Sequence, residues 1–274
     1  MTIRLAVAPE AEAVGARPAA VLGSFGDAVT VVDGDNALGA VREGRAELAA
    51  VPAETLRHPL PGLSVVGALP RGEPRDVLVV RGPAAPSLSA LPGGSRVGVA
   101  GARRHHLLGV HRPDLVVAPF AARRAPMAAY REGAIDAVVV SAAEARSGPP
   151  QARTDLLDPR AWLPAPGQAA VVLVARSGEG PVRDLKGVGV DPATLAALRT
   201  EWALIQALGL DVGSRLAALA MVYGRWIRLW ATVADADQRR LVRADQTGEL
   251  ARPRELADAV ARQLVARGAA EFLP

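Results

Sequence analysis

Short apolar runs alternate with alanine-rich stretches along much of the chain, and this alternation constrains the fold more than any other feature. Apolar runs bounded by turn residues are typical of buried strands, and the stretches between them have the composition of helices. Such an alternation indicates an α/β architecture. The sequence predicts strands over residues 3–8, 29–32, 47–51, 63–69, 76–80, 96–99, 115–118, 137–141 and 169–175, with helices over 11–22, 37–43, 102–110 and 124–132.

The last third of the chain begins with the clearest helix, over residues 191–208. Asp191 is an N-cap residue, Pro192 suits the first helical position, and Gly209 ends the helix. A composition shift at 82–87 indicates a crossing between domains. We predict a first domain over 1–85, completed by 168–176, a second over 90–165 and a third over 180–274. The third holds strands near 216–222, 226–233 and 240–244 and a helix over 253–267.

Composition excludes several kinds of function. The chain has 274 residues and no cysteine, so it has no disulfide, thiolate nucleophile or thiolate metal ligand. No apolar run is long enough to cross a bilayer, and residues 1–8 lack the layout of a signal peptide, so we expect a cytoplasmic protein. Its 32 basic residues are interleaved with 28 acidic ones, and aromatic residues make up 3% of the chain. A nucleic-acid-binding face would cluster the arginines and add aromatic stacking partners. We expect neither a nucleic-acid nor a membrane partner.

Several short motifs occur in the order and with nearly the spacing of one known family. They are E-P-R-D-V-L-V at 73–79, the pair Arg103-Arg104, E-G-A-I-D-A-V at 132–138, L-P-A-P-G-Q at 163–168 and E-W-A-L-I-Q-A-L-G-L-D-V-G-S at 201–214. On these motifs the chain resembles the hydroxymethylbilane synthase (porphobilinogen deaminase) family of biosynthetic enzymes. The resemblance covers almost the whole chain.

The resemblance implies a fold of three domains. The first two would be doubly wound α/β domains, like type II periplasmic binding proteins, that face each other over a cleft. The third would be a small α+β domain. In that fold helix N-termini point into the cleft, where their free N–H groups suit anions, and the family adds arginines that hold the acetate and propionate groups of pyrroles. The family is monomeric as a rule, so we expect a monomer.

The residues that carry the family's chemistry are replaced here. The family attaches its dipyrromethane cofactor to a cysteine, and the matching position is Val212. Its catalytic aspartate matches Thr55, and a hydroxyl does not stabilise a cationic intermediate as a carboxylate does. Neighbours on a strand point to opposite faces, so we do not expect Glu54 to replace that aspartate. We therefore expect no dipyrromethane cofactor.

The family's anion-binding positions are also thinned. Residues 98–101 lack three hydroxyl side chains that the family carries at a helix N-terminus, and residues 120–126 lack both of its arginines. Glu10 stands where the family has a serine. Between residues 32 and 38 the chain lacks the long loop that covers the family's cleft. These independent losses argue against polymerisation of porphobilinogen.

Arg103 and Arg104 are the candidates for a surviving ligand clamp. They lie in the first turn of the helix that follows Gly101, where positive charge opposes the helix dipole. The planar guanidinium fork matches a carboxylate or phosphate, whereas the alternative is a solvated pair without function. The pair at 123–124 lies near the same cleft by the resemblance and has two interpretations: it re-creates the lost positive charge from new positions, or, as is favoured, it is an exposed pair at a helix start. The predicted ligand-binding residues are Arg103, Arg104, Gly101 and Thr55.

The candidate catalytic residues are Thr55, Glu10 and His105, the last as a proton carrier that titrates near neutrality. His105 and His106 are adjacent, so on a helix they diverge and cannot chelate one metal together. The other histidines show no ligand spacing. We predict no metal site.

Two functions fit this sequence. In the first, the fold is repurposed to bind a small anionic metabolite between domains 1 and 2, with a different elimination, condensation or cyclisation of the kind found in secondary metabolism. In the second, the chain is a non-catalytic binding or regulatory protein. Whether it is an enzyme is left open, and authentic hydroxymethylbilane synthase activity is the least favoured.

Overall fold

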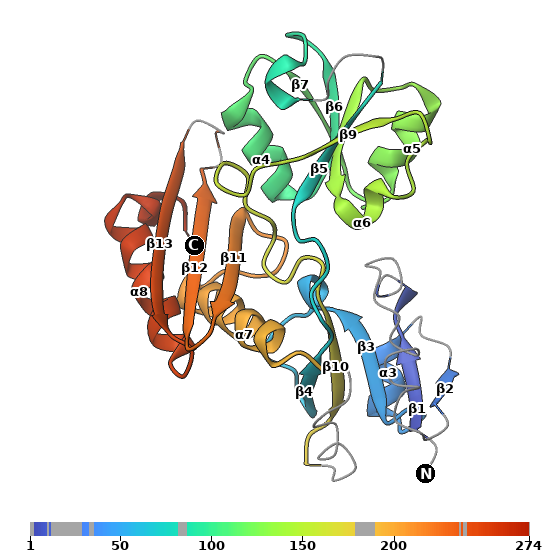
Figure 1. Cartoon of the computed structure of the whole chain (residues 1–274), viewed down its shortest axis with the longest axis vertical. Coiled ribbons are helices and arrows are strands. Elements are labelled where there is room, and N and C mark those ends of the chain that lie inside the picture. The colour runs from blue at the N-terminus through green and yellow to red at the C-terminus, as the bar shows by residue number, and fades with distance from the viewer. Residues whose placement is uncertain are drawn as a thin grey trace.

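The strands in the described part of the chain form three sheets, which confirms the α/β class (Figure 1). The computed structural model describes residues 3–9, 11, 29–32, 36–81, 87–178, 190–235, 237 and 240–273. In Figure 1 the second sheet lies at the top, the first at the lower right and the third at the left. Residues 12–22 of the predicted helix over 11–22 and residues 82–86 of the predicted crossing at 82–87 fall outside the described residues.

The first sheet has the strand order β2-β1-β3-β10-β4. Strand β1 is parallel to β2 and β3, whereas β10 is antiparallel to both of its neighbours. The five strands are β1 (Ile3–Val7), β2 (Val29–Val32), β3 (Leu48–Pro52), β4 (Leu63–Ala68) and β10 (Val171–Arg176). Helix α3 (Ala37–Arg42) precedes β3, and the short 3-10 helix η1 (Ala53–Thr55) follows it.

The second sheet repeats this arrangement, with the order β7-β6-β8-β5-β9. Strand β6 is parallel to β7 and β8, and β5 is antiparallel to β8 and β9. The strands are β5 (Asp76–Val80), β6 (Arg96–Ala100), β7 (Val116–Phe120), β8 (Ala137–Ser141) and β9 (Arg153–Leu156). The helices of this unit are η2 (Leu88–Ala90), α4 (Ala102–His111), α5 (Ala125–Glu132) and α6 (Ala142–Ala145).

Strand β5 lies in the second sheet, although the sequence analysis places residues up to 85 in the first domain. The chain therefore leaves the first unit between β4 and β5, in a segment that contains Pro70 and Pro74. Proline has no N–H to donate to a strand ladder, so the sheet pairing ends there. The chain returns between β9 and β10, and β10 joins the first sheet. Each of these sheets thus contains one antiparallel strand that borders a chain crossing.

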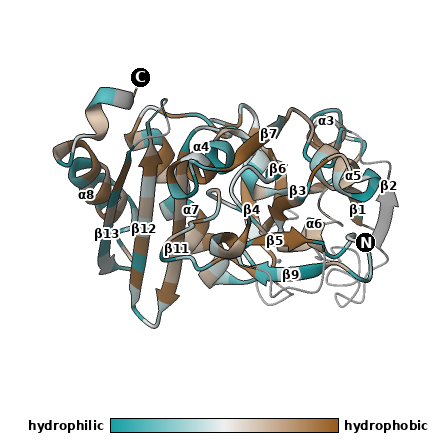
Figure 2. Ribbon diagram, turned by 90° about the horizontal axis from the view of Figure 1, so that it is seen from above, coloured by the Kyte–Doolittle hydropathy of each residue, from teal (hydrophilic) through white to brown (hydrophobic). Residues whose placement is uncertain are grey.

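Strand β9 has no counterpart among the predicted strands. Its residues, R-T-D-L, are mostly exposed at the edge of the sheet. Figure 2 shows β9 in the hydrophilic colour beside the hydrophobic β5. An edge strand with so little apolar surface carries no sequence signal of burial.

The third sheet is an antiparallel meander of β11 (Leu216–Tyr223), β12 (Trp226–Ala234) and β13 (Leu241–Glu249). Its helices are α7 (Pro192–Ala207) and α8 (Pro253–Ala266), and η4 (Ala269–Phe272) follows. Helix α7 begins as predicted, because the Asp191 side chain accepts hydrogen bonds from the backbone N–H groups of Ala193 and Thr194 and Pro192 occupies the first turn.

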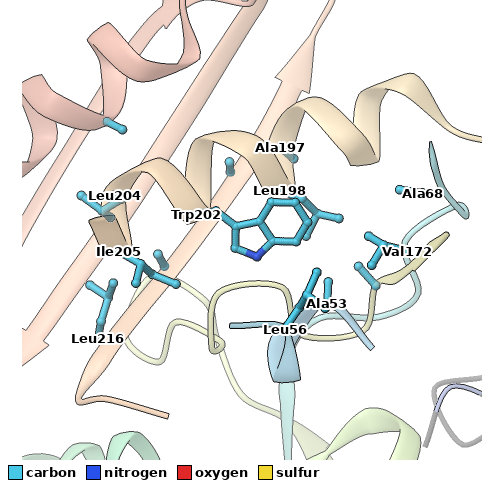
Figure 3. Packing of buried hydrophobic residues seen from close by; sticks show 14 of the residues in the cluster. Ala53, Leu56, Ala68, Val172, Ala197, Leu198, Trp202, Leu204, Ile205 and Leu216 are labelled. Carbon is cyan, nitrogen blue, oxygen red and sulfur yellow. The ribbon is translucent and has the colours of Figure 1, made fainter. Parts of the chain in front are cut away.

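Helix α7 joins the third unit to the first through apolar packing. Leu198 and Trp202 lie in one buried cluster with Ala53, Leu56 and residues of β10 (Figure 3). The same cluster continues through Leu204 to the inner face of the third sheet. A helix that is buried on opposite faces ties two sheets together. No helix in the described ranges has the length and apolar composition that a membrane span requires.

A buried carboxylate on α7 adds a polar connection to this packing. The fully buried Glu201 accepts a hydrogen bond from Arg71 Nη1 at 2.6 Å. It also accepts the backbone N–H groups of Gly167 at 2.6 Å and Ala220 at 2.8 Å. Arg71 lies in the crossing after β4, Gly167 in the returning crossing and Ala220 on β11. One side chain therefore holds both crossings against the third sheet.

Substitution Glu201→Ala is expected to destabilise the fold by about 3–5 kcal/mol, because it removes the counter-ion of Arg71, whose Nε still donates to Gln168 O, and it removes the acceptor of two buried N–H groups. Urea denaturation at pH 7 measures this loss. Glu255→Ala on α8 is the control, since the Glu255 side chain is 70% exposed, and it should change stability by about 0.5 kcal/mol or less. Equal stabilities for the two variants would contradict the role of Glu201.

Candidate functional site

One cavity of about 270 Å³ is lined by segments of all three units. The first unit contributes Glu54 and Thr55 from η1, and the second contributes the turn from β6 into α4 and the loop after β7. The third contributes Ile205 on α7 and the loop from Asp211 to Ser214. All the predicted ligand-binding residues line the cavity, namely Thr55, Gly101, Arg103 and Arg104. Val212 lines it as well.

A second hollow, of about 830 Å³, lies between α4 and the third sheet. It is lined by His106 and by residues of the third unit such as Asp235 and Arg240. Among the described residues, no member of the predicted ligand-binding set lines it. The smaller cavity is therefore the candidate site.

The N-terminus of α4 opens into the candidate cavity. Gly101 precedes the helix with φ 87°, a backbone conformation that glycine adopts without strain, and no side chain among the described residues caps the helix. The first N–H to find an acceptor one turn back is that of His105, which donates to Gly101 O at 3.2 Å. The N–H groups of residues 102–104 precede this bond, so they form the positive end of the helix dipole at the cavity wall. This wall suits a negatively charged group.

Arg103 and Arg104 point their guanidinium groups at a buried carboxylate. Arg103 Nη2 lies 2.7 Å from one oxygen of Asp76, and Arg104 donates to the other through Nε at 3.1 Å and Nη2 at 2.9 Å. Arg103 Nη1 also donates to Leu163 O at 2.8 Å. Both arginines are buried, and Asp76 is buried completely. The predicted clamp is thus engaged inside the protein.

Two more side chains complete the coordination of Asp76. Trp162 Nε1 donates to Asp76 Oδ2 at 2.8 Å, and Gln168 Nε2 donates to Oδ1 at 2.8 Å. Burial alone would raise the pKa of Asp76, but the charges of Arg103 and Arg104 lower it well below its usual value, and the hydrogen bonds act in the same direction. Asp76 is therefore ionised at neutral pH.

Glu54 faces the cavity together with Thr55, which contradicts the expectation from strand alternation. Residues 53–55 form a 3-10 helix after Pro52, so the argument from opposite strand faces does not apply to them. Thr55 Oγ1 donates to Pro52 O at 2.9 Å. The Glu54 carboxylate, with 8% of its side chain exposed, lies 2.7 Å from Arg123 Nη1.

Arg123 lies on the cavity wall, as in the less favoured of the two interpretations of the pair at 123–124. Its side chain is 39% exposed and pairs with Glu54 and, through Nε at 3.3 Å, with Glu144. Burial alone would lower the pKa of Arg123, but the charges of Glu54 and Glu144 raise it above its usual value. Burial would raise the pKa of Glu144, and the charges of Arg104 and Arg123 lower it. These groups form a charged network next to the cavity.

Of the remaining sequence candidates, the structure describes His105 and not Glu10. His105 lies on α4 outside the cavity lining, and burial, together with His106, lowers its pKa, so its ring is neutral at pH 7. Glu10 and residues 33–35 fall outside the described residues. No group of three or more His, Cys, Asp or Glu side chains that could hold a metal ion occurs in the described part of the chain.

The residues of the cavity do not fit the family's dipyrromethane group. Val212 occupies the expected attachment position and lines the cavity, but its isopropyl side chain forms no thioether. The chain has no cysteine elsewhere that could take its place. No chemical step is therefore derived through that group.

Sequence reasoning missed the acidic partners of this site. Asp76 lies within the motif at 73–79, where it was used only to support the resemblance. An aspartate that begins a wholly apolar strand is itself a signal of a buried ion pair. Glu54 and Arg123 carry no comparable signal, because their pairing depends on how two units face each other.

Comparison with known proteins gives matches over most of the chain. A family model described as "Porphobilinogen deaminase, dipyromethane cofactor binding domain" matches residues 39–184. The porphobilinogen deaminase of Roseiflexus castenholzii is 33% identical over 237 residues, which are 85% of this chain and 77% of that protein. That of Moorella thermoacetica is 34% identical over 239 residues, which are 85% of this chain and 75% of that protein.

Solved structures give weaker matches. The periplasmic aliphatic sulphonate binding protein SsuA from Escherichia coli matches with a TM-score of 0.40 and 16% identity, over 64% of this chain and 65% of that one. The BenM effector binding domain with its effector benzoate matches with a TM-score of 0.42 and 13% identity, over 66% and 86%. At these scores the likeness carries no argument about function.

Substitution Asp76→Asn is expected to destabilise the protein by about 3–5 kcal/mol at pH 7, because it leaves two buried guanidinium groups without their counter-ion. Because the native pKa of Asp76 is depressed, its contribution is complete above about pH 5 and is lost as the pH falls below the pKa of an unfolded aspartate, near 4. Urea denaturation between pH 7 and pH 3 should therefore show a shallower acid loss in the variant. Parallel pH profiles would contradict this account.

Proposed function

The chain belongs to the porphobilinogen deaminase family, and from that premise we propose that it does not polymerise porphobilinogen but binds a small anionic metabolite in the cavity between the three units. The observation that carries the proposal is the uncapped N-terminus of α4, which opens into a cavity whose cofactor position holds Val212. The ligand would be a carboxylate small enough for that cavity.

The replaced residues support the loss of the family's reaction. The resemblance places the cofactor cysteine at Val212 and the catalytic aspartate at Thr55. The Thr55 hydroxyl donates its hydrogen bond to Pro52 O, and threonine supplies no negative charge to a cationic intermediate. A growing pyrrole chain would lack its covalent anchor, and the carboxylate beside Thr55, that of Glu54, is paired with Arg123.

The size of the cavity supports a small ligand. Its volume of about 270 Å³ lies just below the range of roughly 300–1,000 Å³ that holds drug-sized molecules. A metabolite with one ring or a short chain fits such a volume.

The charge distribution supports a carboxylate. The N–H groups at the start of α4 carry a partial positive charge of roughly half an elementary charge, and Arg123 adds a guanidinium on the neighbouring wall. Arg103 donates to Asp76, Leu163 O and Gln168, and Arg104 donates to Asp76 through two nitrogens, so these arginines contribute mainly through the placement of α4.

Two observations favour a binding protein without turnover as the second candidate. Thr55 is engaged with Pro52 O, and Glu54 is engaged with Arg123. If a ligand frees Glu54, its carboxylate is the cavity group placed to move a proton, as an elimination or cyclisation requires. Detection of a changed product after incubation with a bound metabolite distinguishes the enzyme from the binding protein.

Incubation with porphobilinogen is expected to leave the mass of the protein unchanged, because no thiol is present to carry pyrrole units. Intact-mass spectrometry checks this, with the Roseiflexus castenholzii relative treated in parallel as the reference. A mass increase by whole pyrrole units in this chain would overturn the proposal.

Titration with propionate is expected to give saturable shifts of the backbone amide NMR signals of residues 102–104, with an affinity of about millimolar for so small a ligand. Propionamide, which has the same shape and no charge, should cause no saturable shift. Equal shifts with both probes, or none with either, would contradict a carboxylate site.

A further inference from the structure

The three arginines that line the cavity differ in their exposure and in how many of their N–H donors already have a partner within the protein. The side chains of Arg103 and Arg104 are 6% and 5% exposed, and both contact Asp76. Arg123 is 39% exposed and lies on the wall of the cavity. We infer that Arg123 is the residue that fixes the carboxylate of the ligand, and that Glu54 is an internal competitor for it. The inference rests on the proposed function and names the residue that sets its specificity.

Arg103 and Arg104 cannot bind a ligand without giving up hydrogen bonds to the buried Asp76. Arg103 divides its Nη atoms among Asp76, Leu163 O and Gln168. Removing either arginine from Asp76 leaves a fully buried carboxylate short of a partner, which costs more than a ligand contact returns.

The two carboxylates on Arg123 are held in different ways. Glu144 forms the capping box of α6, where its carboxylate accepts from Ser141 N at 2.9 Å and Ser141 Oγ at 2.8 Å, and it also lies 3.7 Å from Arg104. Moving Glu144 would uncap that helix. In the described part of the chain, the ion pair of Glu54 is with Arg123, and η1 offers it no such cap. Glu54 is therefore the partner that a ligand can replace.

The charges of the network balance before any ligand binds. Three guanidinium groups face three carboxylates, namely Arg103, Arg104 and Arg123 against Asp76, Glu54 and Glu144. A ligand carboxylate adds a fourth negative charge to a largely buried cluster. Its binding is therefore opposed by Glu54, which carries the same charge and occupies the same guanidinium.

Glu54→Gln and Arg123→Gln should change the affinity for propionate in opposite directions. In the propionate titration, Arg123→Gln is expected to weaken binding about tenfold or more, which corresponds to the loss of a charge-assisted hydrogen bond. Glu54→Gln is expected to tighten binding about threefold or more, because it removes the charge of the replaceable competitor and leaves Glu144 as the charged partner of Arg123. Arg123→Lys keeps the charge and should recover part of the affinity.

A second ion pair on the third sheet supplies matched controls. Arg228 Nη2 lies 2.6 Å from Asp245 Oδ2, and both side chains are close to half exposed. Arg228→Gln and Asp245→Asn change the net charge as the two cavity variants do, and they should leave propionate binding unchanged within about twofold. Thermal melts of all the variants establish that they are folded.

The outcomes separate the two proposals. If the wild-type chain binds propionate and Arg123→Gln binds equally well, the inference is wrong and the proposed function stands. If Glu54→Gln binds no more tightly than the wild-type chain, Glu54 is not a competitor. If neither the wild-type chain nor Glu54→Gln binds propionate, the proposed function itself is overturned.

Discussion

The ion cluster around Asp76 is the interaction on which the rest of the site depends. A fully buried carboxylate is tolerated only when donors surround it, and here four side chains supply them. Two donors come from the first turn of α4, and Trp162 and Gln168 come from the chain that returns to the first unit. The cluster thereby fixes the N-terminus of α4 against the crossing between units. It also consumes the charge that the arginine pair would otherwise present to a ligand.

The sequence predicted the α/β class and most strands because buried strands here are continuous apolar runs, such as Leu48–Pro52 and Ala137–Ser141. The start of α7 was also predictable, since Asp191 and Pro192 act locally. The sheet to which β5 belongs was not predictable, because an apolar run carries no information about which strand it pairs with. Strand β9 escaped prediction because its exposed residues carry no apolar pattern.

The same limit applies to the site. The resemblance singled out Arg103, Arg104, Thr55 and Gly101, and all four line one cavity. It could not show that Asp76, 27 residues before Arg103, already holds that arginine. Nor could it orient Glu54, because the chain leaves β3 at Pro52 and continues as a 3-10 turn. Long-range charge pairing decides which arginine faces the cavity, and it is set by tertiary structure.

The exchange of strands between the first two units has a consequence for synthesis on the ribosome. Strand β10, which completes the first sheet, follows every strand of the second sheet in the chain. The second sheet can therefore form first, before β10 is available to pair with β3 and β4. Until residue 176 has emerged, these two strands have unpaired edges, which are the sites where chains associate wrongly. The first sheet therefore begins to be translated before the second sheet but is completed after it.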